Sequence, residues 1–548
     1  MSAITESKNA DTKGKMENTD TTYLRGIKLY SILSGVMIAT FLISLDVSII
    51  ATAIPCITSQ FHSTTDIGWY GAVYPLTMCS LQPLSGKLMM IFSLRWSYLS
   101  FFLVFLLGSL LCGVATSSSM FIIGRAVAGA GGAGVVSSGL AIIAIVTPIE
   151  QRPLFTGLVT SLYALGTVVA PIIGGAFTTN VTWRWCFLIN LPAGAVTVIT
   201  LILFFHPPQK SPAARTETVL QKLQQLDLIG CALFVPAIIM VLLALQWGGN
   251  KYSWNSATII GLFVGFAATL GLFITWELRA DQAMIPLPLL RRQSIIVSII
   301  FAFLFMGAFV VPVYYLPEWF QIVKGASPIR SGIMLLPSVS TQIFGSIISG
   351  VLAKYIKYYN PWFFIGSSFL CIAIGLYTTF SAFSTTSRDW IGFQILQGLG
   401  CGFAAQMPLL TIQSVLKNDP KLVPVGISTV LFAQYFGSSV MQSICGSIFQ
   451  NKLDSHLQSY AHLDSDQIEM LLVVGTSKVQ ETAQQVFPDR LSAILIAYND
   501  AITNVFYLAV TGSGVAFVLA LGIEWTNTRE STGDDEKDLP VAYDIREP

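Results

Sequence analysis

Residues 29–54, LYSILSGVMIATFLISLDVSIIATAI, form an uninterrupted apolar stretch in which Asp46 is the only charged side chain. An α-helix needs about 20 apolar residues to cross the hydrocarbon core of a bilayer. The stretch therefore predicts a membrane-spanning helix. A carboxylate at that depth in a bilayer costs free energy, so we expect Asp46 to have a functional role.

The composition of the whole chain agrees with this first stretch. Of its 548 residues 53% are hydrophobic and only 11% are charged, and the mean hydropathy is +0.67. A soluble domain carries about 25% charged residues. The excess apolar surface must therefore face lipid, which predicts an all-α polytopic membrane protein. The net charge of +1 leaves no basic face, so we expect no nucleic-acid partner.

Apolar stretches of spanning length recur along the chain and predict fourteen membrane helices. They lie near residues 29–54, 68–87, 97–115, 120–146, 154–177, 185–205, 228–247, 256–276, 295–320, 331–353, 361–381, 390–416, 423–449 and 502–525.

The orientation of these helices follows from the basic residues between them. An even number of spans places both termini on one side. The short loops on that side hold thirteen Lys and Arg residues, against five on the other side. The positive-inside rule makes the richer side cytoplasmic. The first 28 residues are polar and charged, and we expect no cleaved leader.

Weak internal repeats divide the chain into two halves. The sequence Ser85-Gly86-x-Leu88 ends the second span and recurs as Ser349-Gly350-x-Leu352 at the end of the tenth, while the region of Arg125 recurs around Gln394. Matching points at similar offsets favour two duplicated six-helix units with spans seven and eight inserted between them.

The predicted spans and repeats divide the chain into five regions. They are a cytoplasmic tail (1–28), an N-terminal half (29–206), a connecting segment with the inserted spans (207–293), a C-terminal half (294–525) and a second tail (526–548). Within the C-terminal half, residues 451–501 are polar and are expected outside the cell. That segment either caps the outer mouth of the bundle or is a tolerated insertion.

Asp46 and Arg125 are the only charged side chains that fall well inside the predicted spans. A carboxyl group in a medium of low dielectric favours its protonated form, so Asp46 is a candidate proton carrier. Arginine stays protonated and so cannot carry the proton, but it can tune a nearby acid or hold a substrate. The alternatives are a hydrogen-bonding role for Asp46 and a fixed structural ion pair between the two residues.

Several stretches resemble a known family. They are Leu45-Asp46-x-Ser48-Ile49-x-Ala51-x-Ala53-Ile54-Pro55 in the first span, Gly124-Arg125-x-x-x-Gly129 in the fourth, Gly166-x-x-x-Ala170-Pro171-x-x-Gly174-Gly175 in the fifth and Trp183-Arg184-Trp185-x-Phe187-x-Ile189-Asn190-x-Pro192 at the sixth. Together they resemble the major facilitator superfamily, in particular its fourteen-span drug:proton antiporter branch and the fungal toxin and multidrug efflux pumps within it. The resemblance covers about residues 29–525. It implies two six-helix halves plus two inserted helices, no cofactor and a monomer.

The fifth-span stretch resembles the antiporter signature of that family, with Ala170 where a glycine is usual. Pro171 removes a backbone donor and bends a helix, while Gly166, Gly174 and Gly175 allow a partner helix to approach closely. A closely packed, kinked seam can rock while it stays sealed against ions. The alternative is generic packing of small residues.

The loop after the second span departs from the family pattern. Relatives carry an acid there that is thought to lock an inner gate, but this chain reads Gly86-x-Leu88 and reaches Arg95 without one. Gly86, Lys87 and Arg95 are left as the gating candidates.

The chain has no phosphate-binding loop that ends in Gly-Lys-Ser or Gly-Lys-Thr, so the drive for transport must come from a gradient. We expect a secondary transporter that exports amphipathic small organic molecules, such as drugs, toxins or secondary metabolites, in exchange for protons. The alternative is an importer or a vacuolar permease on the same fold. The expected location is the plasma membrane, with the vacuolar membrane as the alternative.

A substrate site is expected between the halves near mid-depth, lined by aromatic and amide side chains that suit uncharged amphipathic molecules. The candidates are Trp69, Tyr74, Gln82, Tyr163, Tyr314, Gln342, Gln394, Gln397, Gln406 and Tyr435. Helix packing is the alternative role of each.

The histidines argue against an enzyme. His62, His206, His456 and His462 lie in loops or at span ends, away from any deep Ser/His/Asp or metal-ligand cluster. We therefore expect no catalytic residue and no metal.

Overall fold

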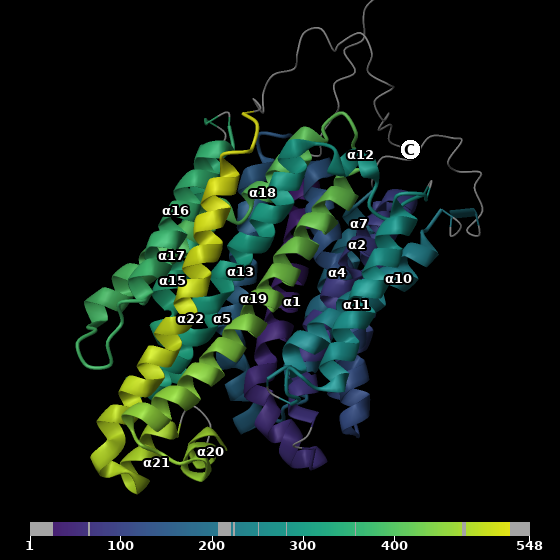
Figure 1. Cartoon of the computed structure of the whole chain (residues 1–548). Helices are drawn as coiled ribbons and strands as arrows, with labels where there is room; N and C mark the ends of the chain where they lie inside the picture. The colour runs from purple at the N-terminus through teal and green to yellow at the C-terminus, as the bar shows by residue number, and fades with distance from the viewer. Residues whose placement is uncertain are drawn as a thin grey trace, which may run out of the picture.

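The computed structural model describes residues 26–525 except 64–65, 207–220, 223–224, 250, 281, 354, 357 and 474–477 (Figure 1). The tail 526–548 and most of the tail 1–28 lie outside the described residues. Within these bounds the chain forms helices, and its one bridge of β type joins Gly248 to Tyr252.

The N-terminal half consists of seven helical segments. They are α1 (Ile27–Phe61), α2 (Ile67–Ile91), α3 (Leu94–Gly113), α4 (Ser118–Val146), α5 (Arg152–Asn180), α6 (Trp185–Leu188) and α7 (Asn190–Phe204). The predicted sixth span is thus split into α6 and α7. Helix α4 starts where the Ser117 side chain accepts a hydrogen bond from the Met120 amide, because such a cap satisfies a donor that has no partner within the helix.

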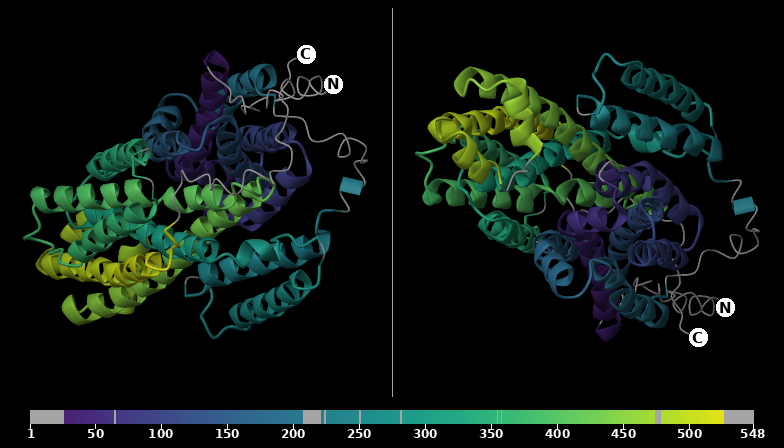
Figure 2. Two further views of the ribbon diagram at one scale, coloured as in Figure 1. Left: turned by 90° about the horizontal axis from the view of Figure 1, so that it is seen from above. Right: turned by 90° about the horizontal axis from the view of Figure 1, so that it is seen from below.

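Two helices, α10 (Leu228–Trp247) and α11 (Ala257–Glu277), form a pair outside the two halves (Figure 2). Helix α10 also packs on α2 and α19, and the ring centroids of Phe234 and Phe432 lie 5.3 Å apart. These are the inserted spans that the sequence predicts.

The C-terminal half follows with shorter pieces. They are α12 (Leu287–Leu290), α13 (Gln293–Ile322), α14 (Pro328–Met334), α15 (Leu336–Leu352), α16 (Asn360–Tyr377), α17 (Ser387–Ala404), α18 (Met407–Val415), α19 (Val423–Tyr460), α20 (Ser465–Val473), α21 (Val479–Val486), η2 (Pro488–Arg490) and α22 (Leu491–Ala520). Two predicted spans are divided, and the second piece of each begins with a proline in its first turn, Pro337 in α15 and Pro408 in α18. Proline has no backbone N–H, so it costs least in the first turn of a helix, where that N–H would have no partner within the helix.

Thirteen stretches of helix in the described part of the chain are long and apolar enough to cross a membrane. The remaining predicted span is α2, a helix of 25 residues that packs in the bundle against α4 and α19. Its composition is less apolar because it includes Gln82, Lys87 and two prolines. The count of fourteen spans therefore stays a prediction for α2.

The polar segment 451–501 is not a separate loop. Its first residues extend α19 to Tyr460, and its last residues belong to α22, which begins at Leu491. Helices α20 and α21 lie between them and share an apolar core with Ile322, Leu457 and Ile494. Figures 1 and 2 show this structure at the end of the C-terminal half rather than across both halves.

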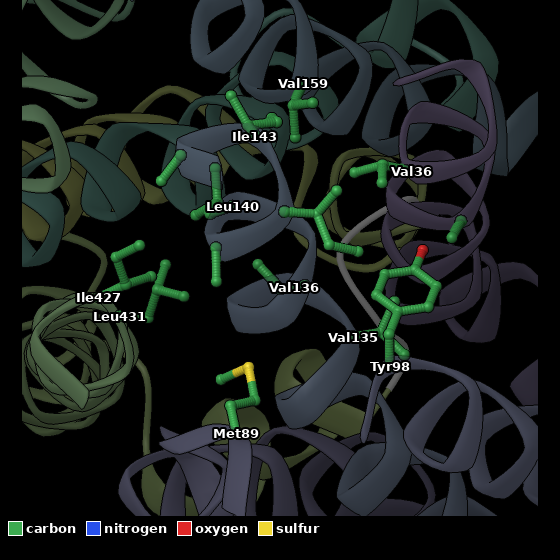
Figure 3. Packing of buried hydrophobic residues seen from close by; sticks show 14 of the residues in the cluster. Val36, Met89, Tyr98, Val135, Val136, Leu140, Ile143, Val159, Ile427 and Leu431 are labelled. Carbon is green, nitrogen blue, oxygen red and sulfur yellow. The ribbon is translucent and has the colours of Figure 1, made fainter. Parts of the chain in front are cut away.

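The two halves pack together mainly at one end. We call the end at which α1 begins and α22 ends the terminal end, and the opposite end the distal end. One apolar cluster at the terminal end joins both halves, and Figure 3 shows Ile427 and Leu431 of α19 facing Val136 and Leu140 of α4, with Met89 of α2 nearby. At the distal end the described apolar clusters belong to one half each.

Candidate functional site

The centre of the N-terminal half contains a buried ion pair. Asp46 of α1 and Arg125 of α4 are 0% and 1% exposed, and the distance from Arg125 Nη1 to Asp46 Oδ2 is 2.5 Å. The same nitrogen also donates to the backbone oxygen of Asp46 at 3.3 Å. Both charges are removed from solvent, so each depends on the other for stabilisation.

Asn190, at the start of α7, completes this ion pair. Its Nδ2 donates to Asp46 Oδ1 at 3.0 Å and to the Ser109 hydroxyl of α3 at 3.1 Å. In the sequence Asn190 is only part of the stretch that resembles the family and is not among the predicted functional residues. Its position inside an apolar stretch was the available signal, since a polar amide there needs partners.

Aromatic rings cover the guanidinium group of Arg125. Its central carbon lies 4.6 Å from the ring centroid of Tyr74 in α2 and 5.8 Å from that of Phe187 in α6. Arg125 Nε, the Tyr74 hydroxyl and Asn190 Oδ1 are buried and have no hydrogen-bond partner among the described residues. The site therefore has unused hydrogen-bonding groups directly beside the carboxylate.

Helix α5 packs closely on α1 through the antiporter stretch. A side chain at Gly166 would place its Cβ 2.9 Å from Ser44 Cβ, and one at Gly174 would lie 2.8 Å from Ile49 Cγ1. Ala170 on the same face is fully buried. Gly175 instead faces open space, with nothing within 4 Å of a Cβ, and Pro171 is exposed within a continuous helix.

Three of the predicted substrate residues come together between the halves. Tyr74 of α2, Tyr163 of α5 and Tyr435 of α19 interact electrostatically through their phenol groups. Tyr74 is buried, whereas Tyr163 and Tyr435 are half-buried. Gln82, further along α2, is fully buried, and within the described part of the chain neither of its amide atoms has a hydrogen-bond partner. The three tyrosines therefore present aromatic faces between the two halves.

Gln406 also lies where the halves meet. Its Nε2 donates to Ser346 O at 3.2 Å and to Ser349 Oγ at 2.8 Å, and its Oε1 is unpartnered. A Cβ at Gly157 of α5 would lie 3.1 Å from that Oε1. The amide therefore contacts the seam between α5 and α15.

Two other candidates are engaged inside the C-terminal half. Gln394 Nε2 donates to Met334 O at 3.0 Å, and Gln397 Oε1 accepts from the Tyr377 hydroxyl at 2.6 Å. Both side chains are buried. They hold α17 to its neighbours, so the structure does not bring them to the seam between the halves.

The three remaining candidates lie elsewhere. Trp69 packs edge-on against Trp247 of the inserted pair, with centroids 5.6 Å apart. Tyr314 of α13 is 48% exposed, and Gln342 of α15 is half-buried. The ten candidates therefore do not form one lining.

The gating candidates also separate. A Cβ at Gly86 would lie 2.9 Å from Val425 Cα, so α2 and α19 meet there. The Lys87 ammonium, 2% exposed, donates to Ala283 O at 2.8 Å and to Gln282 O at 3.3 Å. Arg95 Nη2 donates to Ile202 O at 2.5 Å and so ties α3 to α7 within one half.

Lys87 is thus a third buried charge. The predicted second span ends at residue 87, which puts Lys87 at a loop, whereas α2 continues to Ile91. Two acids of the inserted pair, Asp227 and Glu277, interact with it electrostatically. The Glu277 carboxylate accepts hydrogen bonds from the backbone amides of Met284 and Ile285, at 3.0 and 3.3 Å. Glu318 of α13 is a further acid that is absent from the predicted functional residues, because it lies close to the end of its predicted span. Among the described residues no group of three or more His, Cys, Asp and Glu side chains is arranged to hold a metal ion.

Comparisons with known proteins agree on the kind of molecule. The sequence profile described as Major Facilitator Superfamily matches residues 36–441. The MFS-type transporter poxA of Penicillium oxalicum is 46% identical over 523 residues, which cover 95% of this chain and 92% of that protein. The MFS-type efflux pump MFS1 of Arthroderma benhamiae is 41% identical over 510 residues, covering 92% of this chain and 93% of that protein.

A solved structure shows the same fold. The structure of the proton:xylose symporter XylE bound to 6-bromo-6-deoxy-D-glucose matches with a TM-score of 0.56 and covers 91% of this chain and 97% of that one. The sequence identity is 13%, so this similarity concerns the fold alone.

Proposed function

This chain belongs to the major facilitator superfamily, and from that membership we propose that it exports amphipathic small organic molecules in exchange for protons. As a member it is a multi-pass membrane transporter and not an enzyme. Relatives named as efflux pumps support export over import. We place it in the plasma membrane, where export removes a compound from the cell.

The buried pair of Asp46 and Arg125 is the observation that carries the proposal. Protonation of Asp46 would remove its negative charge and leave the arginine buried without its partner, which costs several kcal/mol. The bundle can avoid that cost by opening the site to water or substrate. The protonation state of Asp46 would therefore bias which end of the bundle is open.

The closed terminal end suggests where each step occurs. With the predicted orientation, the cluster shown in Figure 3 seals the cytoplasmic side, and the distal end faces outward. In this state a proton would reach Asp46 from outside and substrate would leave. Opening of the terminal end would then release the proton inward and admit new substrate.

We propose that Lys87 helps to hold the terminal end closed. Its ammonium joins α2 to the segment after α11, and it takes the place of the latch acid that this chain lacks. The inserted pair would then act as an anchor for α2. Gly86 contributes a close contact with α19 rather than a charge.

The substrate is proposed to bind between Tyr74, Tyr163 and Tyr435, near Gln82 and Gln406. Aromatic faces and unpaired amides suit uncharged amphipathic molecules, because they provide apolar contact and hydrogen bonds without a strict geometry.

Reconstituted vesicles test this proposal. The purified chain in vesicles with an imposed pH difference should move the neutral dye Nile red with a matching proton flux, read by a trapped pH-sensitive dye. Asp46→Asn should reduce the dye-dependent proton flux to the level of protein-free vesicles. Asp419→Asn is the matched control, because Asp419 pairs with Arg292 at the surface.

Two results would contradict the proposal. Equal proton flux in Asp46→Asn and the unaltered chain would remove Asp46 from coupling. Greater accumulation of Nile red in cells that carry the gene than in cells without it would favour the importer.

A further inference from the structure

Two acids of the inserted pair lie together with the buried Lys87 of α2. Asp227 caps the start of α10, and Glu277 is the last residue of α11. Their carboxyl groups interact with each other through their side chains, and both interact electrostatically with the Lys87 ammonium. With both acids ionised, this cluster of Lys87, Asp227 and Glu277 carries one negative charge in excess.

The hydrogen bonds of the two carboxyl groups leave one oxygen unused. Asp227 Oδ1 accepts from the Gly230 amide and from the Trp276 indole, both at 2.8 Å. The two oxygens of Glu277 accept from backbone amides of the segment that follows α11. Asp227 Oδ2 is buried and has no hydrogen-bond partner among the described residues, and the whole side chain is only 7% exposed. A buried carboxyl oxygen without a donor costs free energy, so this position favours a bound hydrogen.

Lys87 does not supply that hydrogen. Its ammonium donates to the backbone oxygens of Gln282 and Ala283, and within the described part of the chain no ion pair joins it to either acid. The lysine therefore offsets one of the two negative charges by proximity alone. The second charge needs another partner.

The other groups around the cluster do not neutralise the second charge. Cys231 of α10 interacts electrostatically with both acids, but a thiol carries no positive charge, and its sulfur lies 3.7 Å from Met284 Sδ. Arg279, beyond the end of α11, is exposed. Helix α19 packs on α2 and α10 and has no charged side chain from residue 423 to residue 450. Among the described residues, Lys87 is therefore the one cation that faces these acids.

We propose that Asp227 and Glu277 share one proton, which fills the position at Asp227 Oδ2 and makes the cluster with Lys87 electrically neutral. Two carboxyl groups at close range hold one proton between them, because two adjacent negative charges in a buried site repel each other. The proton comes from water at the terminal end and returns to it, and the only bond that forms or breaks is an O–H bond.

This proton sets the strength of the Lys87 contact. Its loss restores the excess negative charge and attracts the ammonium away from its two carbonyl partners toward the carboxylates. The effect on closure of the terminal end rests on the proposed function of Lys87. The bound proton itself does not depend on export.

Infrared difference spectra of the purified full chain, recorded between about pH 5.5 and pH 9, test for this proton. Ordinary Asp and Glu side chains have pKa values of about 4 and stay ionised throughout this range. The unaltered chain should therefore show the C=O stretch of a protonated carboxyl group, which disappears as the pH rises. Asp227→Asn should lose that band and still cap α10, because Asn also caps helices.

Glu277→Gln provides a second test that does not alter the cap. It should lose the same band, because the remaining Asp227 then faces Lys87 without a competing acid and ionises. Asp419→Asn is the matched control and should keep the band, since Asp419 pairs with Arg292 at the surface. The band that Asp227→Asn removes should also remain in Asp46→Asn.

Thermal unfolding in detergent gives an independent measurement. The folded chain holds a proton that the unfolded chain releases near neutral pH, so the free energy of unfolding should fall as the pH rises through the range in which the two acids titrate. The unfolding midpoint of the unaltered chain should therefore fall more between about pH 5.5 and pH 9 than that of Asp227→Asn. A purely structural role would shift the midpoint of the variant equally at every pH.

The outcomes separate the shared proton from the export function. A band that is unchanged in both Asp227→Asn and Glu277→Gln, or no such band in the unaltered chain, overturns the proposal. A band that is lost in Asp46→Asn and kept in Asp227→Asn assigns the proton to the other acid and also overturns it. A band that depends on Asp227 and Glu277, in a chain that does not move Nile red, supports the shared proton and removes the export function.

Discussion

In the N-terminal half a buried aspartate and arginine join α1 to α4, whereas in the C-terminal half the region that corresponds to Arg125 carries the neutral amides of Gln394 and Gln397. Both sets of side chains hold helices together. Only the charged set changes its interactions when a proton binds, because an amide does not titrate at physiological pH. The halves share an architecture, and in the proposed mechanism only the N-terminal half holds a side chain that responds to a proton.

The largest expected effect on stability comes from removing one member of the buried charged pair. Arg125→Ala leaves Asp46 buried without its partner and should lower the free energy of unfolding by about 3–5 kcal/mol. The double variant Asp46→Asn, Arg125→Gln removes both charges and should recover much of that loss. The midpoint of thermal unfolding in detergent measures both.

The exposed pair of Arg292 and Asp419 provides the control for this experiment. Asp419→Ala should cost no more than about 1 kcal/mol, since solvent already screens that pair. If the double variant were less stable than Arg125→Ala, the two charges would not form the stabilising unit that the structure indicates.

A smaller effect is expected from the glycines that bring α5 onto α1. Gly174→Ala places a methyl group against Thr52 and Ile49, which should lower the free energy of unfolding by about 1–3 kcal/mol. Gly175→Ala meets open space and should be neutral, or stabilising by up to about 1 kcal/mol. Unfolding midpoints of the two variants test whether the seam depends on one face of α5. Equal losses would contradict a one-sided seam.

The Lys87 contact should have a weaker effect that is confined to the terminal end. Lys87→Met keeps the length of the side chain but loses its bonds to Gln282 and Ala283. Amide hydrogen exchange should become faster at Met284 and at residues 425–431, because the free energy of local opening there should fall by about 1–2 kcal/mol. Arg95→Met, which loses a bond within one half, should leave residues 425–431 unchanged. The reverse pattern would assign the latch to Arg95.

The smallest change is expected from the neutral amide of the C-terminal half. Gln397→Leu removes the hydrogen bond from Tyr377 and should lower the free energy of unfolding by about 1 kcal/mol. Dye-dependent proton flux in vesicles should stay close to that of the unaltered chain. A loss of flux as complete as in Asp46→Asn would show that both halves take part in coupling.

The amino-acid sequence was enough to predict the family, the helical fold and the inserted pair, because bilayer thickness imposes a readable length of apolar sequence. The same reasoning identified Asp46 and Arg125, since charges in such stretches are rare. It failed for Lys87, because the helix α2 continues to Ile91 beyond the predicted span. For residues 451–501 it did not reveal that the two ends of the segment continue α19 and α22, because polar side chains ended the predicted spans at residues 449 and 502.

The sequence by itself determined that this chain crosses the membrane many times and holds an acid and a base inside it, because hydropathy and charge are local properties. Only the tertiary structure decided that the two are partners and that Asn190 and Ser109 join them. The contacts of Asp46, Arg125, Asn190 and Ser109 depend on which helix faces meet across 79 to 144 residues of chain, and periodicity within one helix does not contain that information. For the same reason only the packed structure shows that Gly166 and Gly174 face α1 while Gly175 does not. It also shows that Gln394 and Gln397 lie inside one half, whereas Gln406 lies between the halves.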